Sequence, residues 1–225
     1  YVWLSGFKSD MSGTKVTELK AWATEAGHGF LAFDYSGHGL SDGAFEDGTI
    51  SAWREDALAA IDTHSTGPIV LVGSSMGGWM ALLAALARPD RVAGLVLIAP
   101  APDFTEKLMW PEFSAEAQSE IMEQGFTQRP SDYDEPYTIT RALIEDGQTW
   151  QILDAPIELD IPVRILQGMQ DADVPWKHAE RLVDTITSED LVFTLIKDGD
   201  HRLSREQDIA RLKTTCAEIA TATRP

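Results

Sequence analysis

The 225-residue sequence has one cysteine, no run of about 18 apolar residues, and half as many basic as acidic residues. The single cysteine, Cys216, excludes an internal disulfide framework. The absence of a long apolar run argues against a transmembrane segment. The 18 basic and 36 acidic residues give a net charge of −18, which disfavours nucleic acid and anionic membrane surfaces as partners. The length and composition therefore predict a single-domain protein whose partners are neither nucleic acid nor anionic membrane surfaces.

Cys216 belongs to a stripe of apolar residues spaced like one face of a helix, namely Ile209, Leu212, Cys216 and Ile219. This spacing predicts a core cysteine. The chain begins without Met in a strand-like run, so we expect a further piece to precede Tyr1. No signal peptide is visible, and we therefore expect a cytoplasmic protein.

Apolar strand-like runs alternate with helical patterns along the chain. The predicted strands are 1–4, 30–33, 69–72, 95–98, 163–166 and 191–195. The predicted helices are 13–26, 51–64, 77–88, 178–187 and 204–222. This alternation predicts an α/β fold with a mainly parallel sheet flanked by helices. Functional sites in such folds form beyond the carboxyl ends of the strands.

One segment, 103–155, interrupts this alternation. It contains no convincing strand, and it has twelve acidic residues against three basic ones, Lys107, Arg129 and Arg141. It also carries the aromatic residues Phe104, Trp110, Phe113, Phe126, Tyr133, Tyr137 and Trp150. A connection this long in a compact domain is usually functional. We therefore predict a core of 1–102 and 156–225 with a helical lid or cap insertion at 103–155; a solvated excursion packed on the sheet is the alternative.

The pentapeptide 73–77, Gly-Ser-Ser-Met-Gly, lies between the apolar runs 68–72 and 78–87. This is G-x-S-x-G at a strand–turn–helix junction, where a nucleophilic serine is typically exposed. The tight turn needs small residues two positions before and two positions after the serine. Gly73 and Gly77 meet that need for Ser75, whereas Ser74 would have Val72 and Met76 there. The alternative is a glycine-rich turn without chemistry.

A nucleophilic serine needs a base, and the base needs an acid that orients it. The loop after the last strand contains His201, which we predict to be the base. We predict that the other histidines are structural or on the surface: His28, His38, His64 and His178. Asp171 and Asp173 both follow the penultimate predicted strand. The turn Gly-x-x-Asp-x-x-Val-Pro favours Asp171 as the acid.

Two backbone N–H groups must stabilise the oxyanion. One belongs to Met76, the residue after the nucleophile, and the turn after the first strand offers that of Phe7. Apolar residues near the serine form a candidate acyl pocket, namely Trp79, Met109 and Trp110. The glycine-rich loop 34–43 could indicate phosphate binding, but no phosphate-binding motif accompanies it, which favours a structural turn.

These motifs resemble the α/β-hydrolase superfamily over nearly the whole chain. The strings 13–15, 33–37, 73–79, 168–171 and 200–202 are most similar to the branch that holds the mitochondrial palmitoyl-protein thioesterase, which also cleaves acyl-glucuronides, and its bacterial relatives. The resemblance implies a serine hydrolase of esters or thioesters that uses no cofactor and no metal. Two departures weaken any transfer of substrate preference. The family's usual His-Gly pairs are Ser5-Gly6 in the oxyanion turn and Gln167-Gly168 before the acid.

We therefore expect a serine esterase or thioesterase that works through an acyl-enzyme. Its substrate would be a small acyl ester or thioester, or an acylated protein. The acidic segment 103–155 disfavours a substrate that is anionic near the scissile bond, unless Arg129 or Arg141 points inward. A C–C hydrolase or a cofactor-free haloperoxidase on the same fold is the alternative, as is a ligand-binding receptor without catalysis. Dehalogenases and epoxide hydrolases are disfavoured because they carry Asp at the elbow.

Overall fold

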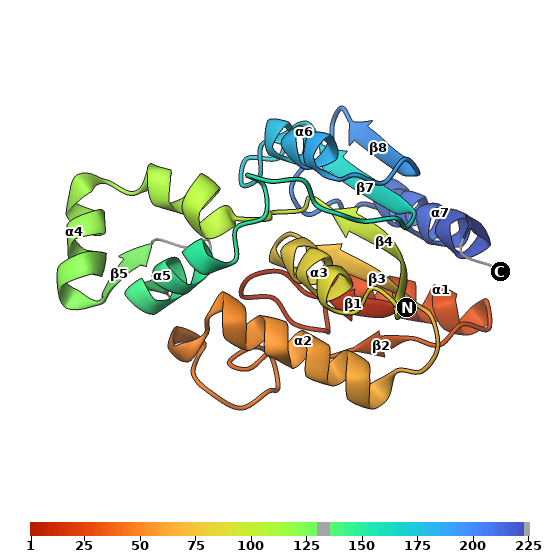
Figure 1. Cartoon of the computed structure of the whole chain (residues 1–225), viewed down its shortest axis with the longest axis horizontal. Helices are drawn as coiled ribbons and strands as arrows, with labels where there is room; N and C mark the ends of the chain where they lie inside the picture. The colour runs from red at the N-terminus through yellow and green to blue at the C-terminus, as the bar shows by residue number, and fades with distance from the viewer. Residues whose placement is uncertain (130–135, 223–225) are drawn as a thin grey trace.

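The computed structural model describes residues 1–129 and 136–222, and its centre is a six-stranded parallel sheet in the order β2-β1-β3-β4-β7-β8. All six predicted strands are present, with shifted ends. They are β1 (Val2–Leu4), β2 (Leu31–Ala32), β3 (Ile69–Ser74), β4 (Val92–Ile98), β7 (Val163–Gly168) and β8 (Leu191–Ile196). Figure 1 shows the sheet with helices on both of its faces. The predicted α/β-hydrolase fold class is confirmed.

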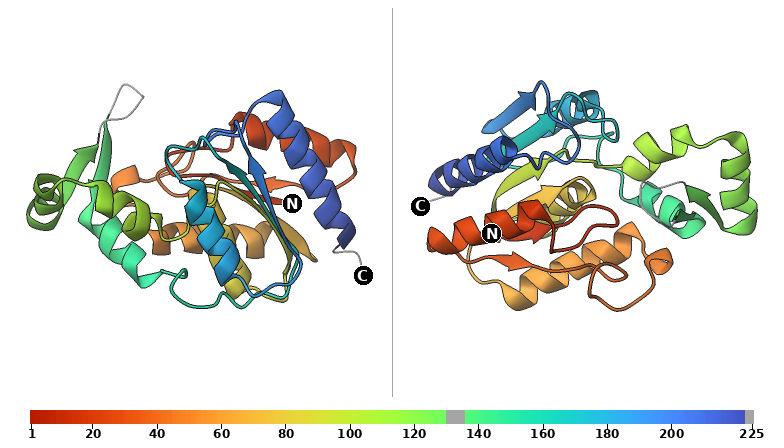
Figure 2. Two further views of the ribbon diagram at one scale, coloured as in Figure 1. Left: turned by 90° about the horizontal axis from the view of Figure 1, so that it is seen from above. Right: turned by 180° about the vertical axis from the view of Figure 1, so that it is seen from behind.

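Alternating residues of the strands build two separate cores. Val70 and Val72 of β3 pack with helices α1 (Thr14–Glu25) and α7 (Glu206–Ala222) on one face. Ile69 and Leu71 pack on the other face with α2 (Ile50–His64), α3 (Met76–Ala87) and α6 (Trp176–Thr185). Figure 2 shows these two helical layers from other directions. A parallel sheet covered on both faces explains why its central strands read as continuous apolar runs.

The residues at the centre of the sheet are buried from solvent. Every residue of β3 is buried, as are the first ten residues of α3. Cys216 of α7 is buried as predicted, and burial raises the pKa of its thiol to about 12. Among the described residues, no helix has the length and apolarity needed to cross a membrane.

The segment 103–155 leaves the sheet after β4 and projects from one end of the molecule (Figure 1). It contains the π-helical turn η2 (Thr105–Met109), the 3-10 turn η3 (Trp110–Glu112), helices α4 (Ala115–Gln124) and α5 (Arg141–Thr149), and strands β5 (Phe126–Arg129) and β6 (Tyr137–Thr140). Because β5 and β6 pair antiparallel, the expectation of no strand here was wrong. Such short strands carry little periodicity, and their pairing is decided by contacts across the segment. Tyr133 lies outside the described residues.

Polar contacts hold this segment together and join it to helix α2. The Asp103 carboxylate, which is fully buried, accepts hydrogen bonds from the N–H groups of Ile152 and Leu153, each at 2.9 Å. Asp103 thus ties the start of the segment to its end. Burial raises the pKa of this carboxyl group. On α2, Ser51 donates to Asp146 of α5 through its N–H (2.7 Å) and its hydroxyl (2.6 Å).

The loop 34–43 is held by its own aspartate. The Asp34 carboxylate accepts the N–H of Met11 at 2.7 Å and that of Leu40 at 3.0 Å. Its carbonyl oxygen accepts the Ser41 hydroxyl at 2.7 Å. Because both carboxylate oxygens are used to hold the chain, the contacts agree with a structural turn.

Candidate active site

Ser75 lies between the end of β3 and the start of α3 in a strained backbone conformation, with φ 56° and ψ −119°. A Cβ at Gly73 would overlap the carbonyl of Gly77, and a Cβ at Gly77 would overlap that of Leu4. The steric demand predicted from the sequence is therefore real at both glycines. Ser75 is also the N-cap of α3, so its hydroxyl lies near the positive end of the helix dipole.

Gly77→Ala is expected to destabilise the protein by about 3 kcal/mol or more, because the added methyl group meets rigid backbone. The melting temperature should fall by roughly 10 °C in thermal unfolding. Gly29→Ala is the matched control, since a Cβ there meets nothing within 4 Å. An unchanged melting temperature for Gly77→Ala would contradict the packing described for the turn.

His201 connects Ser75 to Asp171. The Nε2 atom of His201 lies 3.1 Å from Ser75 Oγ, and its Nδ1 atom lies 2.8 Å from Asp171 Oδ2. A carboxylate only accepts, so Nδ1 carries the hydrogen and Nε2 accepts the Ser75 hydroxyl. The structure thus brings together the three side chains predicted to be nucleophile, base and acid.

Asp173, the alternative acid, lies near His201, but among the described residues no hydrogen bond joins its side chain to the imidazole. Its N–H donates to Asp171 Oδ1 at 3.0 Å, while its own side chain is exposed. Within the described residues, Asp171, Asp173 and His201 are the one group whose ligand-type atoms lie close enough to share a metal ion, within 4.8 Å. A metal there would have to replace the hydrogen bond between His201 and Asp171. These residues therefore fit a proton-transfer chain better than a metal site.

The two candidate oxyanion donors lie next to Ser75. A Cβ at Gly6 would lie 3.3 Å from the Ser74 carbonyl and 3.4 Å from Ser75 Cβ, so the turn holding Phe7 passes directly beside the serine. Among the described residues, the N–H groups of Phe7 and Met76 have no protein acceptor. Both amides are therefore free to bind a ligand oxygen.

His38, predicted to be structural, supports this oxyanion turn. Its Nε2 atom accepts the N–H of Lys8 at 3.2 Å, and its Nδ1 atom lies 3.3 Å from the Ser36 carbonyl. Burial lowers the pKa of His38, which keeps the ring neutral and Nε2 able to accept. The sequence contained no signal for this contact, which joins residues 30 positions apart.

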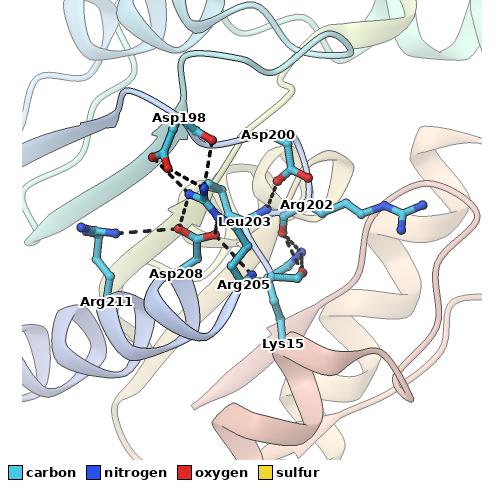
Figure 3. Close-up of polar contacts among 9 residues, drawn as sticks. Lys15, Asp198, Asp200, Arg202, Leu203, Arg205, Asp208 and Arg211 are labelled. Carbon is cyan, nitrogen blue, oxygen red and sulfur yellow. Dashed lines mark hydrogen bonds and ion pairs between the residues drawn. The ribbon is translucent and has the colours of Figure 1, made fainter.

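The loop that carries His201 is braced on both sides (Figure 3). From α1, the Lys15 ammonium donates to the carbonyl of Arg202, the residue after His201. Burial lowers the pKa of Lys15 to about 8. On the other side, Arg205 pairs with Asp198 and Asp208, each at 2.7 Å. These contacts hold the loop in place around the histidine.

A cavity of about 560 Å³ opens over Ser75 and His201. The apolar lining residues Phe104, Leu108, Met109, Tyr137 and Ile139 all come from the segment 103–155, which also contributes the charged residues Glu112 and Arg129. Polar lining residues come from the chain between β1 and the start of α1 and from the chain just after His201, namely Ser5, Ser9, Asp10, Thr14, Lys15, Arg202 and Ser204.

Of the three residues predicted for an acyl pocket, only Met109 lines this cavity. Trp79 is fully buried in the core, where its ring packs edge-on against Phe104, and Trp110 is not among the lining residues. Sequence reasoning also missed Leu108 and Ile139, because nothing local indicates which side of a segment faces the serine.

Of the two arginines in 103–155 that were considered from the sequence, one lines the cavity. Arg129 does line it and pairs with Glu112 at 3.0 Å, whereas Arg141 is not among the lining residues and pairs with Glu145 at 2.6 Å. Arg202 also lines the cavity. In Figure 3 its guanidinium group points away from the ion pairs that Arg205 makes with Asp198 and Asp208. Within the described part of the chain, that group has neither an acidic nor a carbonyl partner.

Comparisons with known proteins agree with this architecture. The family model described as the alpha/beta hydrolase family matches residues 2–213. The human mitochondrial palmitoyl-protein thioesterase ABHD10 is 36% identical over 220 residues, which span 97% of this chain and 72% of the human protein.

Two solved structures are also similar. One is a protein of Agrobacterium vitis S4 described as a putative hydrolase, with a TM-score of 0.94 and 47% sequence identity. The match covers 97% of this chain and 86% of the Agrobacterium chain. Mouse alpha/beta hydrolase domain-containing protein 10 has a TM-score of 0.91 at 36% identity, over 99% of this chain and 90% of its own. The resemblance noted from the sequence motifs is confirmed, and this chain belongs to the alpha/beta hydrolase family.

Proposed function

We propose that this protein hydrolyses carboxylic esters or thioesters through an acyl-enzyme on Ser75. The observation that carries the proposal is the hydrogen-bonded chain from Ser75 Oγ through His201 to Asp171, at 3.1 and 2.8 Å, at the floor of a cavity. This is the arrangement that converts a weak serine nucleophile into an effective one.

In the first half-reaction, Ser75 Oγ attacks the acyl carbon while His201 Nε2 takes the hydroxyl proton. The negative charge that develops on the carbonyl oxygen is stabilised by the N–H groups of Phe7 and Met76. When the tetrahedral intermediate collapses, His201 gives its proton to the leaving alcohol or thiol. Asp171 holds the imidazole in the tautomer that this transfer needs.

In the second half-reaction, water takes the place of the leaving group. His201 Nε2 removes a proton from the water as its oxygen attacks the acyl carbon. The same two amides stabilise the second oxyanion. The bond between Ser75 Oγ and the acyl carbon then breaks, the serine regains its proton from His201, and the carboxylic acid leaves.

We further propose that 103–155 is a cap whose inner surface forms the acyl side of the cavity. Leu108, Met109, Tyr137 and Ile139 all come from this segment and are apolar or aromatic. The polar side, with Lys15, Arg202 and Ser204, would then receive the leaving group beside His201. The mammalian relatives are named as palmitoyl-protein thioesterases, which supports a long-chain acyl thioester or an acylated protein as substrate. They are also named as mitochondrial, so the cytoplasmic location stays a prediction.

Activity on p-nitrophenyl esters is expected to rise with acyl length from acetate upward. Each methylene group buried in the apolar compartment contributes about 0.8 kcal/mol, or roughly a fourfold gain in kcat/KM per carbon until the compartment is full. Leu108→Trp should lower kcat/KM for octanoate by at least about tenfold and leave that for acetate nearly unchanged. A flat profile across acyl length would contradict the proposed acyl compartment.

A fluorophosphonate probe tests the enzyme proposal directly, because it forms a covalent bond only with an activated serine. The folded protein should be labelled at Ser75, as located by peptide mass spectrometry, and labelling should disappear after heat unfolding. A binding receptor without catalysis would remain unlabelled. Parallel panels of acyl-CoA thioesters and p-nitrophenyl esters then distinguish thioesterase from esterase.

A further inference from the structure

The Asp171 carboxylate accepts four hydrogen bonds. Its Oδ1 atom accepts the N–H groups of Asp173 at 3.0 Å and Val174 at 2.8 Å. Its Oδ2 atom accepts His201 Nδ1 at 2.8 Å and Gln167 Nε2 at 3.0 Å. A carboxylate offers about four acceptor positions, so all of them are used. Gln167 is the one donor that is neither backbone nor part of the proposed Ser-His-Asp chain.

The acceptors around the side-chain amide of Gln167 fix its orientation. The residue is fully buried on β7, and its Nε2 atom lies 3.0 Å from Asp171 Oδ2, 3.0 Å from the Val174 carbonyl and 3.2 Å from the Gly168 carbonyl. The reversed amide would place its oxygen against three acceptors. The NH₂ group therefore faces Asp171.

The side chain of Gln167 also destabilises the fold through its second polar atom. The Oε1 atom of Gln167 is buried and has no hydrogen-bond partner. A buried acceptor without a partner destabilises the fold, and an apolar side chain of similar volume would avoid that penalty. Packing alone therefore does not account for an amide at this position, whereas its bond to Asp171 does.

We propose that Gln167 is a positioning residue for the acid of the triad, an inference that rests on the proposed hydrolase function. By bonding both Asp171 Oδ2 and the Val174 carbonyl, it links the two ends of the loop that holds the carboxylate. Its N–H also shares the negative charge on the oxygen that faces His201. Gln167 thus sets both the direction of the carboxylate and the strength with which it holds the imidazolium.

The test is the pH dependence of kcat and KM for an activated ester with Gln167→Leu. The substitution removes the donor while keeping similar volume. We expect kcat to fall about 10- to 100-fold with KM little changed, because the acyl compartment is intact. The acid limb of the pH–kcat profile should move to higher pH, because an unshared carboxylate charge holds the imidazolium more tightly. The other charged groups near His201, including Asp173, Asp200 and Arg202, are the same in every variant.

Gln170→Leu is the matched control. Gln170 lies in the same loop, and its amide approaches the Lys197 carbonyl at 3.4 Å and not Asp171. This variant should keep wild-type kcat within about twofold and an unshifted profile. Gln167→His is the rescue, since a ring N–H can donate to Asp171, and it should recover most of the lost kcat.

A Gln167→Leu enzyme with a lower melting temperature but wild-type kcat and pH profile would overturn the proposal, because it would show a purely structural role. If that variant does not fold, Gln167→Met decides, since it also removes the donor at similar volume; wild-type kcat with an unshifted acid limb there overturns the proposal equally. A wild-type protein that is inactive and unlabelled at Ser75 would instead refute the hydrolase function.

Discussion

Replacing Ser75 with alanine is expected to lower kcat by at least about 10⁴-fold, with the fold retained. His201 Nε2 bonds to the Ser75 hydroxyl, so the variant has no nucleophile in reach of the base. Alanine at position 75 can adopt the same backbone conformation as serine, and its side chain is smaller. Steady-state hydrolysis of an activated ester, together with a thermal unfolding curve, measures both effects.

Ser74→Ala is the matched control for this result. Ser74 ends β3 and precedes the nucleophile by one position, yet its side chain is buried within the strand environment. Its removal should change kcat by no more than about threefold. If Ser75→Ala kept more than about one hundredth of the wild-type rate, the acyl-enzyme route through Ser75 would be wrong.

The second large effect is expected from Asp171→Asn, which should lower kcat by about 10⁴-fold near neutral pH. The N–H groups of Asp173 and Val174 both donate to Oδ1, so the amide oxygen of the new side chain must take that position. Its NH₂ group then faces His201 Nδ1 and forces that nitrogen to accept. The proton moves to Nε2, which can no longer receive a proton from Ser75.

Asp173→Asn separates the two candidate acids. The N–H of Asp173 still donates to Asp171 after the change, because that bond comes from the backbone. Its exposed side chain should be replaceable with a loss of no more than about threefold. A larger loss from Asp173→Asn than from Asp171→Asn would reverse the assignment of the acid.

The elbow was predictable because its requirement is local. A side chain at position 73 or 77 would clash with nearby backbone in this tight turn, and glycine at both positions avoids that clash. The positions of Asp171 and His201 were predictable for a different reason. Parallel strands end at the same edge of a sheet, so loops that follow β7 and β8 must meet the loop that follows β3.

The compartments of the cavity were not predictable in the same way. Trp79 follows the elbow closely, but its side chain packs in the core, while Phe104, which packs against it, lines the cavity. The β5–β6 pair was missed because short strands depend on each other and not on their own sequence. The same holds for His38, whose partner Lys8 lies 30 positions away.

Taken by itself, the sequence determined the fold class, the family, the order along the chain of the strands and helices outside 103–155, and the three side chains of the candidate triad. All of these follow from short patterns or from chain order. Only the tertiary structure decided that Asp171 bonds His201, that Gln167 completes the shell around that carboxylate, and which residues line each side of the cavity. Those facts depend on which side chains meet across elements distant in sequence, and dense packing, not local pattern, selects them.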